Sequence, residues 1–265
     1  MSAARRRRFA AELRRRVRAL VVMGCLHAVM TRPLGPAALR VPNPGGTYGT
    51  EGGTALPVLL LGDSLALGVG VRGGEPTVGA QLATALAEAL RRPVRLRVRA
   101  RTGSTAKALG GQVRRAPDGP GAAVIVIGGN DAVRPVRLRS SARHLGRCVT
   151  ALRERGWTVT VLTCPDYRAS TGLRRWIRRT AVHRADRLRE LQRDAAATAG
   201  AEVITPPTDA FLADPSRMFC EDGCHPSAEG YAAQVAHALP SLVHSWQNLR
   251  DLRDPVRQAG DHAAD

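Results

Sequence analysis

Lysine is nearly absent from this sequence of 265 residues: Lys107 is its only lysine, and arginine supplies the other basic side chains. The formal net charge of +18 would ordinarily indicate a polyanion partner such as nucleic acid. An excess made almost wholly of arginine fits a bias of the whole sequence toward Arg, Ala and Gly better than a selected basic patch. Aromatic residues make up only 3% of the chain, so platforms on which single-stranded nucleic acid stacks are hard to build. We therefore expect no nucleic-acid partner.

Cysteine is also scarce. Five cysteines are an odd number and form no C-x-x-C pair, which excludes a disulfide framework and a zinc ribbon. A single bridge between Cys220 and Cys224 stays open, and two reduced thiols in a loop are the alternative. A metal site at Cys220, Cys224 and His225 would lack a fourth ligand at a sensible spacing. We predict no metal ion there.

No apolar run in the chain is long enough to span a membrane as a helix, which takes about 20 residues. Residues 19–30 are apolar and follow the basic clusters 5–8 and 14–16. They have the length of a signal-peptide core, but no small-x-small cleavage site follows them. An arginine-rich amphipathic helix lying on a membrane or on the domain itself is the third interpretation. A cytoplasmic, a membrane-associated and an exported protein all stay open.

From Leu56 onward, short apolar runs alternate with longer helical stretches. Apolar strands separated by helical crossovers form a parallel sheet whose two faces are both covered. We predict an α/β fold, a three-layer α/β/α sandwich around a central parallel sheet of about five strands. The expected strands are residues 58–61, 94–98, 123–127, 158–162 and 202–204, and the expected helices are 77–90, 104–114, 136–155, 173–199 and 227–243.

This pattern predicts one domain over residues 55–248. A basic N-terminal segment, residues 1–54, precedes it and ends in a Gly- and Pro-rich stretch, 42–54, that we interpret as a linker. A charged tail follows at residues 249–265.

Reactive residues of such a sheet gather at the carboxyl ends of its strands. The first expected strand ends in the sequence Gly-Asp-Ser-Leu at residues 62–65, which places the Ser64 hydroxyl at a helix entrance. A helix N-cap explains Asp63 and Ser64 equally well. The nucleophile elbow G-x-S-x-G is not satisfied, because Ala66 stands where its second glycine should be.

Two further blocks follow the second and third expected strands. Residues 128–131 read Gly-Gly-Asn-Asp, and the Asn130 amide could donate to a developing oxyanion. Gly103 could present a backbone N–H to the same charge. For each block a plain turn is the alternative.

Asp222 and His225 stand three positions apart ahead of the last expected helix. A tight loop with this spacing can place the carboxylate against one imidazole nitrogen and leave the other to take a proton from serine. A surface loop with a solvated histidine is the alternative.

In this order, the four blocks resemble those of the SGNH (GDSL) hydrolase family, over about residues 56–243. The resemblance implies a flavodoxin-like sandwich and a serine ester hydrolase of the esterase or lipase type. It implies that Ser64 attacks a small-molecule or lipid acyl ester, that His225 accepts the proton, and that Asp222 orients the ring. An acyl-enzyme follows, and the Ser64 and Gly103 N–H groups and the Asn130 side chain form the oxyanion hole. No cofactor is implied.

Two other functions stay open. An acyltransferase of the same family would use the same triad, and the blocks could also survive as the scaffold of a binding protein. The helix expected from Leu173 carries many arginines opposite an apolar face, which is typical of a solvated helix packed on a sheet. Peripheral contact of these basic segments with an anionic membrane is the sharper interpretation. The sequence does not indicate an oligomeric state.

Overall fold

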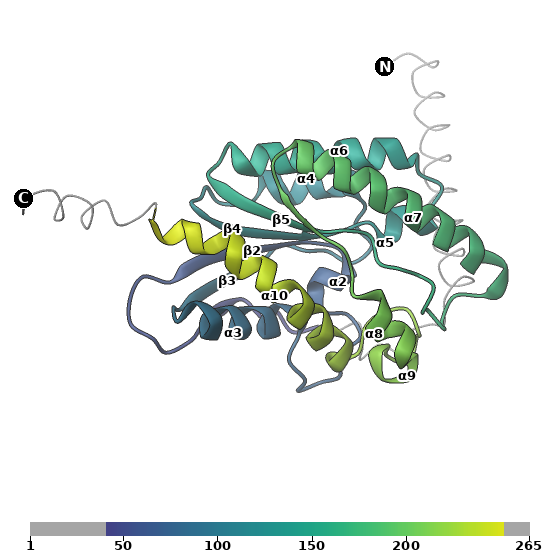
Figure 1. Ribbon diagram of the computed structural model, residues 1–265, viewed down its shortest axis with the longest axis horizontal. Coiled ribbons are helices and arrows are strands. Elements are labelled where there is room, and N and C mark those ends of the chain that lie inside the picture. Colours follow the sequence, from purple (N-terminus) through teal and green to yellow (C-terminus); the bar gives the residue numbers. More distant parts are fainter. Residues whose placement is uncertain (1–40, 252–265) are drawn as a thin grey trace, which may run out of the picture.

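A six-stranded sheet forms the middle of the protein in the computed structural model, which describes residues 41–251 (Figure 1). The strand order is β1-β3-β2-β4-β5-β6. Strands β2 to β6 all pair parallel with one another, and β1 pairs antiparallel with β3 at the edge of the sheet. The strands are β1 (Gly46–Tyr48), β2 (Leu56–Gly62), β3 (Val94–Val98), β4 (Gly121–Val126), β5 (Trp157–Leu162) and β6 (Glu202–Ile204).

The five parallel strands are those that the sequence predicts, and the α/β fold is confirmed. The sixth strand was not predicted: β1 lies within residues 42–54, which we interpreted as a linker. Its three residues, Gly-Thr-Tyr, form no apolar run, and antiparallel pairing with β3 holds them. The sheet is therefore mixed rather than parallel throughout.

Helices cover both faces of this sheet (Figure 1). Helices α3 (Val78–Leu90) and α10 (Ala228–Asp251) pack on one face, and α4 (Ala106–Arg114), α6 (Leu138–Arg153) and α7 (Arg175–Thr198) pack on the other. Four short helices lie in the connections: α2 (Ser64–Leu67), α5 (Gly129–Val133), α8 (Thr208–Ala213) and α9 (Pro215–Met218).

The apolar run of β2 follows directly from this layering. Val58 and Leu60 belong to the core on the α3 and α10 side, while Leu59 and Leu61 belong to the core on the opposite side. All four side chains are at most 1% exposed. A strand buried on both faces needs no polar alternation, which is why it reads as a continuous apolar run.

Parallel pairing brings the carboxyl ends of β2 and β4 to the same edge. Gly62 at the end of β2 is in register with Val126 at the end of β4. Helix α2 begins at Ser64 and helix α5 at Gly129, so each starts within three residues of its strand. The segments carrying Ser64 and Asn130 therefore lie beside each other.

The terminal segments lie outside the described residues. They include residues 1–40, with the apolar run 19–30, and residues 252–265 of the expected tail. The domain boundaries stay predictions. Within residues 41–251, no helix is long and apolar enough to cross a membrane.

Truncating a core leucine of α3 should destabilise the fold. Leu86 is fully buried between α3 and the sheet, so Leu86→Ala should lower the free energy of unfolding by about 2–5 kcal/mol. Urea denaturation measures this value. Glu88→Ala, at an exposed position of the same helix, should change it by less than about 0.5 kcal/mol. Equal losses in the two variants would contradict the assigned packing of α3.

Candidate active site

Three polar side chains form one hydrogen-bonded chain at the carboxyl edge of the sheet. The Ser64 hydroxyl oxygen lies 2.9 Å from Nε2 of His225, and Nδ1 of the same ring lies 2.5 Å from Oδ2 of Asp222. Ser64 and His225 are 161 positions apart in the chain. Ser64 begins α2, whereas Asp222 and His225 stand in the loop between α9 and α10. The fold thus brings together the three residues that the sequence singled out.

The Asp222 carboxylate fixes which nitrogen of His225 carries a proton. An ionised carboxylate can only accept, so Nδ1 donates and Nε2 is left to accept from the Ser64 hydroxyl. The other oxygen, Oδ1, accepts the backbone N–H groups of Cys224 and His225, each at 2.8 Å. Burial works to raise the pKa of Asp222, but the hydrogen bonds from His225 and Cys224 and the imidazole charge outweigh it and lower the pKa overall. Asp222 therefore stays ionised.

Close backbone packing fixes the loop that carries Asp222 and His225. The Gly172 N–H donates to the carbonyl of Gly223 at 2.9 Å, and the Ser170 hydroxyl donates to the same carbonyl at 2.8 Å. Gly70, which follows α2, has a φ of +111°, and a Cβ there would lie 2.4 Å from the Pro226 carbonyl oxygen. Only glycine allows this approach. Segments on two sides thus hold the loop in place.

A helix N-cap is the alternative interpretation of Asp63 and Ser64. In the structure Asp63 alone takes this role. Its Oδ1 accepts the N–H of Leu65 at 3.0 Å and so caps α2. Ser64 takes the first helical position, and its hydroxyl is directed at His225. The cap and the reactive hydroxyl therefore belong to two adjacent residues.

Gly62 sets how closely β2 and β4 approach at this end. Its φ is +142°, and a Cβ there would lie 1.9 Å from the Val126 carbonyl oxygen, so a side chain cannot be accommodated. The buried Gln112 of α4 accepts the Gly62 N–H at 2.9 Å and donates to the Gly62 carbonyl at 2.7 Å. The amide of Gln112 thus fixes the residue two positions before Ser64.

Asn130 lies on α5 and faces the same site. Its Nδ2 donates to Oδ2 of Asp63 at 3.4 Å, and both groups are buried. Burial raises the pKa of Asp63 to about 6, against the lowering effects of the Leu65 N–H, the His225 charge and the Asn130 amide. Next to Asn130, Asp131 turns toward α4 and accepts the N–H of Ala106 with both oxygens, at 3.1 and 3.3 Å.

Arg134 connects Gly103 to α5. Its Nη1 donates to the Gly103 carbonyl at 3.0 Å, and its own backbone N–H donates to the Asn130 carbonyl at 3.1 Å. The Arg134 carbonyl in turn accepts from Nη2 of Arg184 at 2.8 Å. Arg184, on α7, also donates to the carbonyls of Asp131, Ala132 and Val136. One guanidinium therefore fastens the end of α5.

An open cleft surrounds these groups and holds about 510 Å³ of space, part of it open to solvent. Gly103 lies at the same edge of the sheet but does not line the cleft. A mainly apolar cavity of about 430 Å³ adjoins it and shares four of its residues. The cleft is lined by Asp63, Ser64, Leu65, Gly129, Asn130, Val133, Pro165, Tyr167, Leu173, Cys224 and His225.

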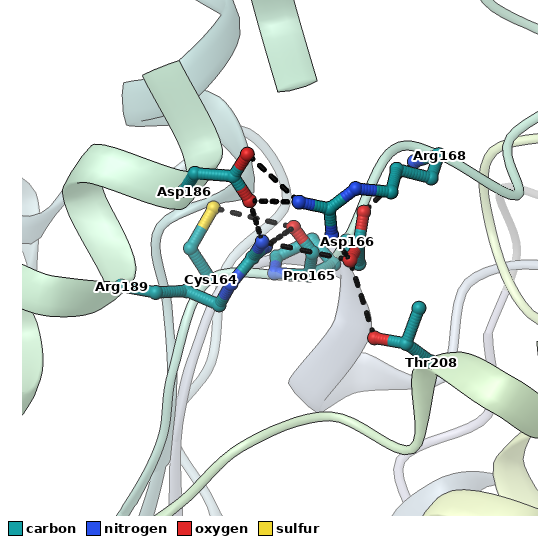
Figure 2. A network of polar contacts seen from close by, with 7 residues as sticks. All are labelled: Cys164, Pro165, Asp166, Arg168, Asp186, Arg189 and Thr208. Carbon is teal, nitrogen blue, oxygen red and sulfur yellow. Dashed lines mark hydrogen bonds and ion pairs between the residues drawn. The ribbon is translucent and has the colours of Figure 1, made fainter. Parts of the chain in front are cut away.

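A network of arginines and carboxylates surrounds the loop after β5 (Figure 2). Pro165 of this loop lines the cleft. Asp166 accepts from Arg168, from Nη2 of Arg189 at 3.5 Å and from the Thr208 hydroxyl at 3.3 Å. Arg189 also donates to the Pro165 carbonyl at 3.0 Å and pairs with Asp186 of its own helix. These bonds join the loop after β5 to α7 and α8.

The helix predicted from Leu173 is α7, and two of its arginines differ from the expected solvated role. Arg184 and Arg189 are partly buried and bind protein groups. Arg174, Arg175 and Arg178 are exposed, as expected for a basic side. Contact of this side with a membrane stays a prediction.

Cys220 and Cys224 are free thiols in the structure, which is the alternative to a bridge between them. Burial raises the pKa of Cys220 to about 12 and that of Cys224 to about 11, so both stay protonated at neutral pH. The Cys220 thiol donates to Oδ1 of Asp222 at 3.1 Å. Within the described residues we find no cluster of His, Cys, Asp or Glu side chains that could hold a metal ion.

Comparison with known proteins identifies the family. The family model described as GDSL-like lipase/acylhydrolase matches residues 60–233. The chain belongs to this family. It is 37% identical over 184 residues to the GDSL-like esterase Rv1075c of Mycobacterium tuberculosis, which covers 66% of this chain. The chain spans 58% of the length of that relative.

Solved structures of GDSL-type proteins share the fold. A member of the lipolytic G-D-S-L family from Veillonella parvula superposes with a TM-score of 0.56 and 17% identity, over 70% of this chain and 97% of that one. A lipase/acylhydrolase from Enterococcus faecalis gives a TM-score of 0.54 and 19% identity, over 70% and 94% of the two chains. Both likenesses concern the fold.

Sequence reasoning missed several residues that position the groups of this GDSL chain. Gln112 stands between Leu109 and Val113 on the apolar side of α4, and a polar residue in such a place could have signalled a buried role. Arg134 and Arg184 had no such signal, because arginine is too common in this sequence for one to stand out.

Asp63→Asn should remove a pH dependence from the stability of the protein. Because burial raises the pKa of Asp63 from 3.8 to about 6, the folded state binds this proton more tightly than the unfolded state. The contribution to stability is complete below pH 3.8 and is lost as the pH rises through 6. The wild type should therefore lose about 3 kcal/mol more than Asp63→Asn over this window.

Urea denaturation at pH steps from 4 to 7 measures this difference. Asp194→Asn, at an exposed position of α7, should retain the pH dependence of the wild type. Parallel pH profiles for the wild type and Asp63→Asn would show that Asp63 is not the titrating group.

Proposed function

We propose that this protein is a serine ester hydrolase in which Ser64 is the nucleophile, His225 the general base and Asp222 the group that orients the base. The observation that carries the proposal is the chain of hydrogen bonds from the Ser64 hydroxyl through His225 to Asp222, at 2.9 and 2.5 Å. Ser64 and His225, which form one of these hydrogen bonds, line the cleft. A serine hydroxyl is a weak nucleophile until an adjacent base accepts its proton.

The reaction proceeds in two stages. In the first, Nε2 of His225 takes the Ser64 proton while the serine oxygen bonds to the ester carbonyl carbon; the imidazolium then gives that proton to the departing alcohol. In the second, His225 takes a proton from water, the hydroxide oxygen attacks the acyl-enzyme, and the proton returns to Ser64 as the acid leaves. Asp222 stays ionised throughout and stabilises the imidazolium.

The negative charge on the carbonyl oxygen needs donors during both stages. We assign these donors to the Ser64 and Gly103 backbone N–H groups and to the Asn130 side chain. The bond from Asn130 to Asp63 uses one hydrogen of the Asn130 amide and leaves the second for the substrate. A donor placed in this way contributes roughly 3 kcal/mol to lowering the barrier.

The substrate is proposed to be an acyl ester. Leu65, Val133 and Leu173 give the cleft apolar walls against which an acyl group can pack. The relative at 37% identity is named an esterase, which agrees with this class.

Transfer of the acyl group to another alcohol is the second candidate. The cleft is partly open to solvent, which leaves room for an alcohol to reach the acyl-enzyme in place of water. Product analysis with a sugar acceptor present separates the two: acylated acceptor would show a transferase, and free acid alone a hydrolase.

Ser64→Ala should abolish hydrolysis of p-nitrophenyl acetate, with a loss of kcat/KM of at least about 10³-fold, because no other group replaces the attacking oxygen. Labelling by a fluorophosphonate should disappear while the circular dichroism spectrum is retained. Ser140→Ala, on α6, should keep both activities. Labelling that survives in Ser64→Ala would show that another residue is the nucleophile.

Asn130→Ala should lower kcat by roughly 10²–10³-fold and change KM little, because the lost donor acts on charge that develops only in the transition state. Steady-state kinetics on p-nitrophenyl acetate measure both constants. Asn43→Ala, in an exposed turn, is the control. A rise in KM at constant kcat would instead make Asn130 a substrate-binding residue.

A further inference from the structure

A row of four arginines lies along the sheet near the site. Arg95, Arg97, Arg99 and Arg101 occupy alternate positions and are all exposed. The residues between them turn the other way: Leu96 is buried in the core beside α3, and Val98 packs against that core. Alternation puts Arg95 and Arg97 on one face of β3, about 6.6 Å apart along the strand, and the same alternation continues through Arg99 and Arg101 beyond its end. We call them the arginine row.

The row ends near the proposed nucleophile. Beyond the end of β3, the Arg99 N–H donates to the Leu60 carbonyl at 2.8 Å, and the Arg101 N–H donates to the Gly62 carbonyl at 3.1 Å. Parallel pairing with the neighbouring β2 therefore extends to Gly62, two residues before Ser64. Gly103 comes two positions after Arg101, and the sole lysine of the chain, Lys107, is exposed in the first turn of α4.

None of the four guanidinium groups has a protein partner among residues 41–251: no ion pair or side-chain hydrogen bond involves them. Some exposed arginines elsewhere in the described part of the chain pair with carboxylates, as Arg217 does with Glu229 and Arg155 with Asp118, whereas others stand singly, as Arg143 does on α6. The row differs in that its four charges are evenly spaced along one strand and its extension. Neighbouring guanidinium groups without counter-charges repel one another, and binding of an anion reduces this repulsion.

Among residues 41–251, no helix covers this face of β3 as α4 covers β2. Helix α4 covers β2, where Leu59, the register partner of Arg97, is completely buried. On the outer side, the register partner of Arg95 is the exposed Thr47 of β1. The face of β3 that carries the arginines is therefore an exposed strip of sheet beside α4, which we call the shelf.

We propose that the arginine row binds the anionic chain of an acylated polysaccharide and leads its ester to Ser64. The proposal rests on the proposed ester hydrolysis. An ester forms on a hydroxyl, and four spaced guanidinium groups match repeated anionic groups. A polysaccharide with carboxylate groups carries both along one chain. Guanidinium groups recognise carboxylates by paired hydrogen bonds.

Other polyanions fit the row less well. Peripheral binding to a membrane uses exposed apolar side chains beside the charges, and the large apolar side chain exposed among the described residues is Leu212, on α8 after β6 at the far side of the sheet. Single-stranded nucleic acid needs aromatic platforms, and the row contains none.

The test uses the full chain with polygalacturonate, an anionic polysaccharide, as an inhibitor of p-nitrophenyl acetate hydrolysis. Polygalacturonate should inhibit the wild type, neutral dextran should not, and added salt should weaken the inhibition. In Arg97→Gln/Arg99→Gln the inhibition constant should rise about tenfold. Arg143→Gln/Arg147→Gln, which removes two exposed charges from α6, should keep both the hydrolysis rate and the inhibition constant of the wild type. Absent inhibition, or an equal rise in the two double variants, would overturn the proposal.

A binding measurement separates this inference from the proposed function. Fluorescence anisotropy of labelled polygalacturonate, measured with Ser64→Ala, should give the same dependence on Arg97 and Arg99 even if catalysis were assigned to another residue. Tighter arginine-dependent binding of single-stranded DNA or of phosphatidylglycerol vesicles than of polygalacturonate would overturn the assignment to a polysaccharide. Hydrolysis retained in Ser64→Ala would reject the proposed nucleophile and leave the anisotropy result to decide the arginine row.

Discussion

The close approach of β2 to β4 at Gly62 is the constraint on which the site depends. With a side chain at this position, the Val126 carbonyl could not stay in place, and the register between the two strands would change. That register places α2 beside α5, which lets Asp63 receive the Asn130 amide while it caps the helix that begins at Ser64. Gln112 then binds both backbone groups of Gly62. Backbone packing at Gly62 therefore determines where the side chains of the candidate site lie.

Three buried carboxylates near the site, those of Asp63, Asp131 and Asp222, receive different numbers of hydrogen bonds. Asp222 receives two backbone N–H groups, a thiol and the imidazole, and it stays ionised. Asp131 receives the Ala106 N–H with both of its oxygens. Asp63 has one backbone N–H and one long amide bond, which do not offset its burial, and its pKa rises to about 6. Asp63 thus gives up stability near neutral pH while it holds Asn130 in position.

Local sequence was enough to predict those elements whose apolar pattern follows directly from burial. The runs at β2 and β4 are apolar because both faces of the sheet are covered, and the turns that end them carry Ser64 and Asn130. The strand β1 could not be found in this way, because three residues at an edge are held by pairing with β3 and not by burial. The arginines that hold Gly103 and the end of α5 could not be predicted, for a different reason. Arg134 and Arg184 act through carbonyl groups far away in the chain, and only the folded arrangement shows which arginines of an arginine-rich sequence are so used.

The two hydrogen bonds of Arg134 also determine how the segments around Gly103 and Asn130 can move. One residue holds the Asn130 carbonyl with its backbone and the Gly103 carbonyl with its side chain. The two segments that carry the proposed oxyanion donors are thereby mechanically joined, although they follow different strands. A shift of α5 would displace both donors in the same direction, so the hole would open or close as a unit and would not lose one donor at a time. Arg184 fastens this joint to α7, the same helix whose Arg189 anchors the opposite wall of the cleft. Small movements of α7 would therefore change the width of the cleft and the position of its donors together.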